Sequence, residues 1–521
     1  MCAAMDPDIM QRGGSKQRAA KRAAQTSAAV PEPSRLATHL LRSFGWGKMS
    51  LPEVQVVAAL VEEDALEPVK AEIRILANLG SRGLYQGNLR RDLLRHTQMP
   101  ALVSSNVCVP IKKALRAAIP FLDPVDVFRS LQRQPMVFRE LCCRNDGDIA
   151  NFWREVGSSH PALLHHPVKK IKNYQSRAVP LILHGDGVPI DSKDRSCAFI
   201  SWRSLLSSQT SSKLVHVLIS AVWTEQIVVS SCGNTVASIW GHVVRAFERC
   251  FEECKTNNDL FPVLLFCSCG SMALPSPQLL PSPATPCEPQ WCDSGLDAQQ
   301  APRLRPAAGW LNVVGSLLED YWRQHKGNGI NYITQTMVLA DPQDIHCRKG
   351  YPRLKAKAAE TKGVIAALAS ICQQHLQQDN EEHQQIALAL SFSRDLDQMA
   401  DGIEDWKPSK EVADRMMLTA VCLFQCMTIL NKSFLEQGHL AFQLTFKTHW
   451  FLHGLQLARH LSPKLTWTYS GEDYMSKCKG LLKMCTKSRT MLTSLDRFMR
   501  QYTDAMSIEL AEILAQPGPP L

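Results

Sequence analysis

The chain has 521 residues, 45% of them hydrophobic and 21% charged, a length and composition that suit about two to four folded domains. No uninterrupted apolar run approaches the roughly 18 residues of a membrane span, and the N-terminus MCAAMDPDIM has no signal-peptide core, so we expect neither a membrane protein nor a secreted one. The 18 cysteines are scattered and favour reduced thiols in an intracellular protein, nuclear or cytoplasmic, while the net charge of +9 permits nucleic-acid contact without requiring it.

Residues 1–49 form a basic tail that we predict to be disordered. Five basic residues are interleaved there with small ones, namely Arg12, Lys16, Arg18, Lys21 and Arg22. Such a segment buries too little apolar area to fold alone. It suits a nuclear-import or phosphate-contacting arm, and equally a solvated terminus without a function; a mitochondrial presequence fits less well because two aspartates precede the basic run.

Residues 50–168 are predicted to form a helical N-terminal domain. Ser50 and Glu53 have the spacing of a capping box, so a helix should begin near Leu51. Further helical patterns cover Ile111 to Ala118, Pro124 to Gln132 and Ile149 to Val156.

Residues 169–270 change to short β-rich runs. The segments VPLILHGDGVPI, SCAFISWRSL and KLVHVLISAVW read as three successive strands. An amphipathic helix from Thr235 to Cys254 follows, and LFPVLLFCSC reads as a fourth strand. The order strand, strand, strand, helix, strand opens an RNase H-like fold, so we predict a small α/β core inside a predominantly helical protein.

Residues 271–308 are rich in proline and serine and are predicted to be a linker or insertion. Residues 309–515 are almost wholly helical in pattern, with apolar stripes beginning at Val364 and Val412, and return to the core. The last element, expected from about Glu472 to Met506, carries the basic residues Lys477, Lys479, Lys483, Lys487, Arg489, Arg497 and Arg500.

Asp186 is the first candidate for chemistry. It ends a predicted buried strand between Gly185 and Gly187, which would let other groups approach closely. RNase H-like nucleases and transposases need a carboxylate at this place, because their acidic side chains hold two divalent metal ions. The alternative is a turn residue after the strand, where Gly-Asp-Gly is common.

Several segments, taken in order, resemble a transposon-encoded family found in protist genomes. In that family a helical lead-in precedes a strand with a LHGDG-type motif. A P-x-LKxKAAE motif, an H-x3-H element and an N-P-x-x-x-W-x-Y-x-x-ED segment that opens a basic helix follow. The matching segments here are FWREVGSSHPALLHHPV, Leu183 to Gly187, Tyr351 to Gly363, His449 with His453, and Pro463, Trp467, Tyr469, Glu472 and Asp473. The resemblance spans roughly residues 120 to 500 with gaps.

The resemblance to RNase H-like transposases with a helical insertion, such as the hAT and Kyakuja-Dileera-Zisupton groups, implies site residues. Asp186 would be the first metal-binding acid and Glu472 the last, with Asp473 beside it, and the metal would be Mg²⁺ or Mn²⁺. A carboxylate at a helix N-terminus also serves as a simple cap, and that alternative stays open for Glu472 and Asp473. His449 and His453, four apart on a predicted helix, would both face one metal or phosphate, or serve only the structure.

The second acid that this fold needs is missing from its expected place. After the fourth strand the chain reads Phe266, Cys267, Ser268, Cys269 and Gly270, without a carboxylate. Asp293, Asp297 and Asp341 lie in or beyond the insertion and are not attached to the strand end. We therefore expect an inactive site or an insertion foreign to the family.

Other chemistry receives little support. Cys267, Cys269, Cys287 and Cys292 lack the usual C-x2-C spacing of a zinc knuckle. The sequence contains no Walker A loop, GxSxG, HExxH or GxGxxG motif, which argues against the common enzyme classes that use them.

Two hypotheses follow. The first is a transposase-derived DNA-binding protein with a degenerate metal-dependent strand-transfer site, in which Lys16, Arg18, Lys21, Arg22, Lys477, Lys479, Lys483, Lys487 and Arg489 contact DNA phosphates. The second is a non-catalytic helical interaction or scaffold protein. One continuous basic face near Asp186 would favour the first, and dispersed charges the second. Self-association is compatible with both.

Overall fold

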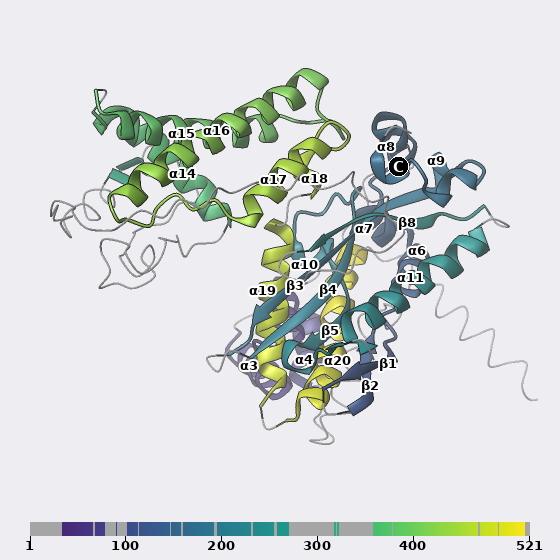
Figure 1. Ribbon diagram of the computed structural model, residues 1–521. Coiled ribbons are helices and arrows are strands. Elements are labelled where there is room, and N and C mark those ends of the chain that lie inside the picture. The colour runs from purple at the N-terminus through teal and green to yellow at the C-terminus, as the bar shows by residue number, and fades with distance from the viewer. Residues whose placement is uncertain are drawn as a thin grey trace, which may run out of the picture. The chain divides into compact units, whose positions relative to one another are not determined.

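Figure 1 shows the computed structural model of the chain. The structure describes residues 34–65, 68–78, 90, 102–112, 114–145, 147–157, 160–191, 195–230, 233–254, 258–269, 317–318, 320–321, 323, 358–377, 379–466, 469–487 and 489–515. The predicted basic tail up to residue 33 and the predicted linker 271–308 lie outside these residues. The chain divides into two compact units, Met1–Met99 with Ser507–Leu521, and Pro100–Met506.

The first unit is helical. It contains α2 (Arg35–Gly45), α3 (Leu51–Asp64), α4 (Ala71–Asn78) and the last residues of α20 (Met491–Ala515). The predicted capping box is confirmed: the Glu53 amide donates to Ser50 Oγ and the Ser50 amide donates to the Glu53 carboxylate. Residues 35–45, which we expected in the tail, form α2 because their apolar face packs on α3 and α4.

The second unit begins with a β-hairpin where a helix was predicted. The predicted helix from Ile111 to Ala118 is wrong, because β1 (Ser105–Ile111) and β2 (Ala114–Phe121) pair antiparallel. Buried and exposed residues alternate in β1, and β2 joins the main sheet through Phe121 opposite Ser220. Sheet pairing has overridden the helical propensity of the alanine-, lysine- and leucine-rich segment.

The predicted order strand, strand, strand, helix, strand is confirmed in residues 169–270. The elements are β3 (Ala178–Pro189), β4 (Ser196–Ser204), β5 (Val217–Trp223), α11 (Thr235–Cys254) and β8 (Phe261–Cys269). The six strands lie in the order β1-β2-β5-β4-β3-β8, with β3 antiparallel to β4 and parallel to β8. The predicted mixed and predominantly helical class is confirmed.

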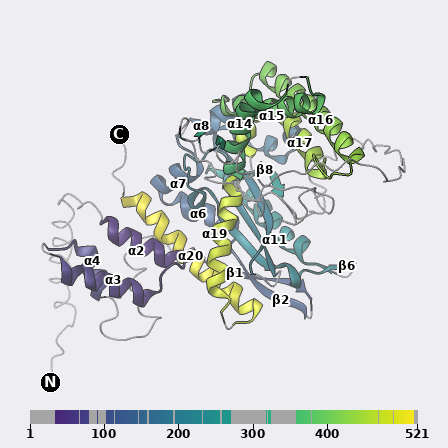
Figure 2. The same cartoon turned by 90° about the vertical axis from the view of Figure 1, so that its left-hand side faces the viewer.

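Helices lie on both faces of this sheet. One face carries α19 (Tyr469–Cys485) and the first part of α20, and α11 crosses the other (Figures 1 and 2). The remaining elements before β8 are α6 (Pro124–Gln132), α7 (Pro135–Cys142), α8 (Asp148–Val156), η2 (Pro161–Leu163), η3 (Pro167–Lys170), α9 (Tyr174–Arg177), α10 (Ser212–Val215), η4 (Thr224–Gln226), β6 (Val229–Ser230) and β7 (Gly233–Asn234). The predicted helices at 124–132, 149–156 and 235–254 are thereby confirmed.

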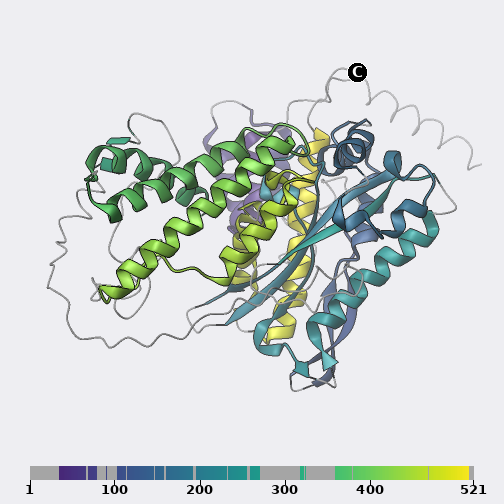
Figure 3. The same ribbon diagram turned by 45° about the horizontal axis from the view of Figure 1, so that its top comes forward.

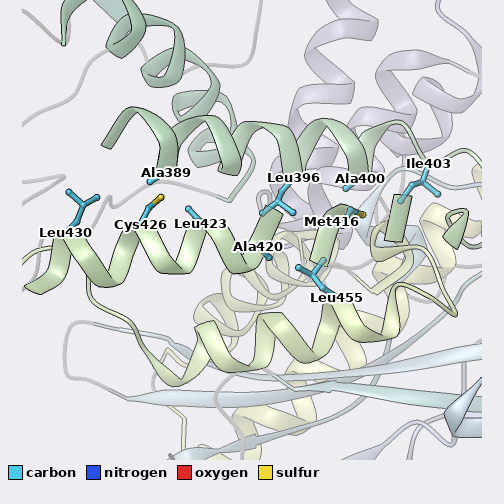
Figure 4. Packing of buried hydrophobic residues seen from close by; sticks show 10 residues of the cluster. All are labelled: Ala389, Leu396, Ala400, Ile403, Met416, Ala420, Leu423, Cys426, Leu430 and Leu455. Carbon is cyan, nitrogen blue, oxygen red and sulfur yellow. The ribbon is translucent and has the colours of Figure 1, made fainter. Parts of the chain in front are cut away.

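The helical region before α19 forms a bundle with its own core. Its helices are α14 (Ala358–His375), α15 (Glu381–Asp401), α16 (Lys410–Glu436), α17 (Phe446–Leu457) and α18 (Pro463–Thr466) (Figure 3). Buried side chains of α15, α16 and α17 meet between them (Figure 4). Trp406, which lies between α15 and α16, connects this bundle to α8. Its ring meets that of Phe152 of α8 at 5.6 Å between centroids.

Among the described residues, α16 is the one helix long and apolar enough to cross a membrane, judged by length and composition alone. A helix packed inside a bundle passes the same test. Met416, Ala420 and Leu430 of α16 are buried in the bundle core.

Candidate functional site

Asp186 lies inside β3, between two neighbouring strands. It stands opposite Phe199 of β4 and directly after Gly185, which is the last residue of β3 paired with β8, opposite Cys269. Because pairing with β4 continues to Pro189, Asp186 is a strand residue and the alternative of a turn after the strand is wrong. Its side chain is half-buried, and one carboxylate oxygen accepts the Gly187 amide at 2.8 Å.

The start of α19 packs on the face of β3 that carries Asp186. Side chains two apart on a strand share a face, so His184 and Asp186 point the same way. A methyl group at Gly471 of α19 would stand 2.7 Å from His184 Nε2, closer than atoms approach without overlap. Only glycine lets the helix come this near, and Glu472 follows it in the first turn. The two predicted acids therefore lie on elements that touch.

A buried polar cluster holds α19 in this position. The ring of His216 stacks on Tyr474 at 5.1 Å between centroids, and its Nε2 lies 3.0 Å from Ser470 Oγ. The Tyr474 hydroxyl donates to the Tyr502 hydroxyl at 2.9 Å, which also accepts the Leu218 amide of β5 at 2.9 Å. The cluster links β5, α19 and α20.

The electrostatics around this cluster keep its histidine neutral. Burial, with smaller contributions from Arg203 and His184, lowers the pKa of His216 well below its usual range. Burial also lowers the pKa of Arg203 to about 10, and this guanidinium donates to the Leu465 carbonyl. A neutral, buried His216 suits positioning of α19 better than contact with a phosphate.

Asp473 serves to attach α19 to α10. Its carboxylate accepts the Ser212 hydroxyl and pairs with Lys477 Nζ at 3.4 Å. Glu472 is exposed in the first turn of the same helix. A carboxylate near a helix N-terminus also favours the helix dipole, so the capping alternative stays open for Glu472.

The described side chains do not by themselves fit a two-metal centre. Among them, no three His, Cys, Asp or Glu side chains lie close enough together to hold a metal ion. The side chains of 266–269, among them those of Cys267 and Cys269, and all of residues 270–316 lie outside the described residues, as does Asp341. We therefore derive no chemical step through a metal.

The basic residues of the last predicted element do not form one face. The prediction of one helix from about Glu472 to Met506 is wrong, because α19 ends at Cys485 and α20 begins at Met491. Thr490 caps α20, since its hydroxyl accepts the Thr493 amide. Lys479 and Lys483, four apart, lie on one side of α19, whereas Lys477 lies on the side of Asp473. Lys487 and Arg489 follow the helix and are exposed. The tail residues Lys16, Arg18, Lys21 and Arg22 lie outside the described residues.

The pair His449 and His453 shares one side of α17, as predicted. Both side chains are exposed, and their Nε2 atoms lie 3.0 Å apart.

The sequence interpretation missed the residues that position α19. His184 and Gly471 stand inside the LHGDG and YSGED segments, directly beside the acids that were predicted as metal ligands. The signal that would have found Gly471 is a glycine in the first turn of a helix that must approach a strand closely. His216 and Tyr474 carry no local signal, because their contact joins segments more than 200 residues apart.

No protein-family model matches this sequence, and no curated protein matches it.

Proposed function

We propose that this chain is a transposase-derived DNA-binding protein with an RNase H-like core and a degenerate strand-transfer site. The observation that carries this proposal is the strand arrangement β5-β4-β3-β8, with Asp186 on β3 and the first turn of α19 on the same face. In RNase H-like enzymes the first strand carries the first acid, and a later helix brings another acid to it. We infer that β3 with Asp186 and α19 with Glu472 correspond to these two elements.

The same observations support a degenerate rather than a working centre. Two-metal catalysis needs several acidic ligands that converge on ions about 4 Å apart. The described residues provide no group of three ligands, and Asp473 is engaged with Ser212 and Lys477. With Mg²⁺ or Mn²⁺ as the expected ions, Asp186 and Glu472 would be remnants of the ligand set.

Nicking and strand transfer on supercoiled plasmid, with Mg²⁺ or Mn²⁺, test this proposal. Wild type and Asp186→Asn should both leave the plasmid intact while both retain DNA binding. Asp496→Asn is a matched control, because Asp496 is an exposed acid of α20 on no predicted site. Cleavage by wild type and by Asp496→Asn that is absent in Asp186→Asn would show a working centre and contradict degeneracy.

A specific observation also favours the second hypothesis, a non-catalytic interaction protein. The outer side of α16 exposes large apolar side chains, with Leu418 65% and Ile429 53% exposed. Such a surface suits a protein partner better than a phosphate backbone. This hypothesis replaces the first proposal on two results together. The wild-type protein would not bind DNA at low salt, and it would associate with another protein chain through a contact that Leu418→Glu abolishes.

A further inference from the structure

The side chains of His449 and His453 bring two ring nitrogens together on the exposed side of α17. They lie one turn apart on α17, their Nε2 atoms are separated by 3.0 Å, and their rings are perpendicular with centroids 4.5 Å apart. Both side chains are exposed, so an ion can reach them from solvent.

A third side chain fixes the proton on one of the two rings. His453 Nδ1 lies 3.0 Å from Gln456 Oε1, and a carbonyl oxygen only accepts hydrogen bonds. Nδ1 therefore carries the proton, and the lone pair of His453 is on Nε2, directed at His449. Metal-binding histidines commonly donate their other ring N–H to such a partner, which orients the ring.

The separation of the two nitrogens matches a shared metal ion. Zinc binds imidazole nitrogen at about 2.0–2.1 Å, so two ligands of one tetrahedral ion stand about 3.3 Å apart, and two neighbouring ligands of an octahedral ion about 2.9 Å. The observed 3.0 Å falls between these values. Since His453 Nε2 is the acceptor in the metal-free protein, His449 Nε2 carries the bridging proton. When the ion binds, this proton moves through water to Nδ1 of the same ring, which leaves both Nε2 lone pairs for the ion, and a small rotation of either ring completes the geometry.

We propose that His449 and His453 form a surface site for one divalent transition-metal ion of the class that prefers imidazole, such as Zn²⁺ or Ni²⁺. Gln456 positions His453 without binding the ion. Among the described residues no third His, Cys, Asp or Glu completes the site, and water would supply the remaining ligands of the proposed ion. This site is separate from Asp186 and Glu472 and does not depend on the proposed function.

Calorimetric titration of the full chain with Zn²⁺ and with Ni²⁺ tests the site. His449→Ala and His453→Ala should each bind one ion fewer than wild type, whereas His439→Ala, a change outside α17, should bind the wild-type number. Gln456→Ala should keep the site with about 10- to 100-fold weaker affinity, because the orienting hydrogen bond is lost. Mg²⁺ should not bind at these residues, because it prefers oxygen ligands.

The alternative is that the two rings only share a proton. In that case both single alanine variants would titrate like wild type with Zn²⁺ and Ni²⁺, and the proposal is overturned. Circular dichroism of each variant checks that the helix persists. A complementary readout is Cu²⁺ electron paramagnetic resonance, in which a two-imidazole signal present in wild type should disappear in His453→Ala and remain in His439→Ala.

Discussion

Gly471 shows how a single residue determines the approach of α19 to the sheet. A methyl group there would lie 2.7 Å from Nε2 and 2.9 Å from two carbons of the buried His184 ring. Gly471→Ala should therefore destabilise the fold by about 1–3 kcal/mol, the usual cost of overpacking a core. Urea unfolding measures this change.

Gly480 provides the matched control in the same helix. It is exposed, and nothing lies within 4 Å of the position its methyl group would take. Gly480→Ala should gain about 0.5–1 kcal/mol, because alanine favours the helix interior. Equal effects of the two substitutions would contradict the close approach of α19 to β3.

Tyr502 joins three elements through one buried hydroxyl group. It accepts the Leu218 amide of β5 and the Tyr474 hydroxyl of α19. Tyr502→Phe leaves both donors buried without this acceptor and should cost about 1–3 kcal/mol in unfolding free energy. Tyr474→Phe removes only one donor and should cost less. A larger loss in Tyr474→Phe than in Tyr502→Phe would contradict the central role of the Tyr502 hydroxyl in this cluster.

At the scale of elements, the structure separates what local patterns predict from what they do not. The start of α3 follows from the Ser50 and Glu53 spacing, and α11 follows from its 3.6-residue periodicity, because both signals act within a few residues. The hairpin of β1 and β2 was missed because the alanine-, lysine- and leucine-rich segment has a helical pattern, which its pairing with β1 overrides. Asp186 was identifiable because the pattern of its own strand is local. The contact of Gly471 with His184 was not, because it joins segments that are far apart in the sequence.

The C-terminal residues of α20 complete the helical unit around α2 and α3. Glu509 is buried; its carboxylate accepts Trp46 Nε1 at 2.7 Å and pairs with Arg42 Nε at 3.2 Å. Glu509→Ala should cost about 1–3 kcal/mol, mostly from the buried indole N–H, because the partly exposed Arg42 can reach water.

Hydrogen exchange checks this prediction by location. Amides of α2 should exchange faster in Glu509→Ala, while amides of α15 and α16 keep their rates. Glu512→Ala is the comparison, because Glu512 is less buried and also pairs with Arg42. Equal acceleration in all helices would mean that the residue stabilises the chain as a whole rather than this unit.

At the scale of the whole molecule, the question is whether a net charge of +9 acts on a partner. The charges of α19 are divided, and only Lys479 and Lys483 share a side. If these two contact phosphates, the logarithm of DNA affinity should fall linearly with the logarithm of salt concentration, and each lysine removed should lessen the slope by about 0.9. The double variant Lys479→Ala and Lys483→Ala should thus reduce the slope by about 1.8.

Lys410→Ala is the control for this prediction. Lys410 is an exposed lysine of α16 that already pairs with Asp414 at 2.8 Å, so its removal should leave the slope unchanged. An unchanged slope in the double variant would exclude this side of α19 from the DNA contact. DNA binding that does not depend on salt concentration would contradict the hypothesis that this protein contacts phosphates at all.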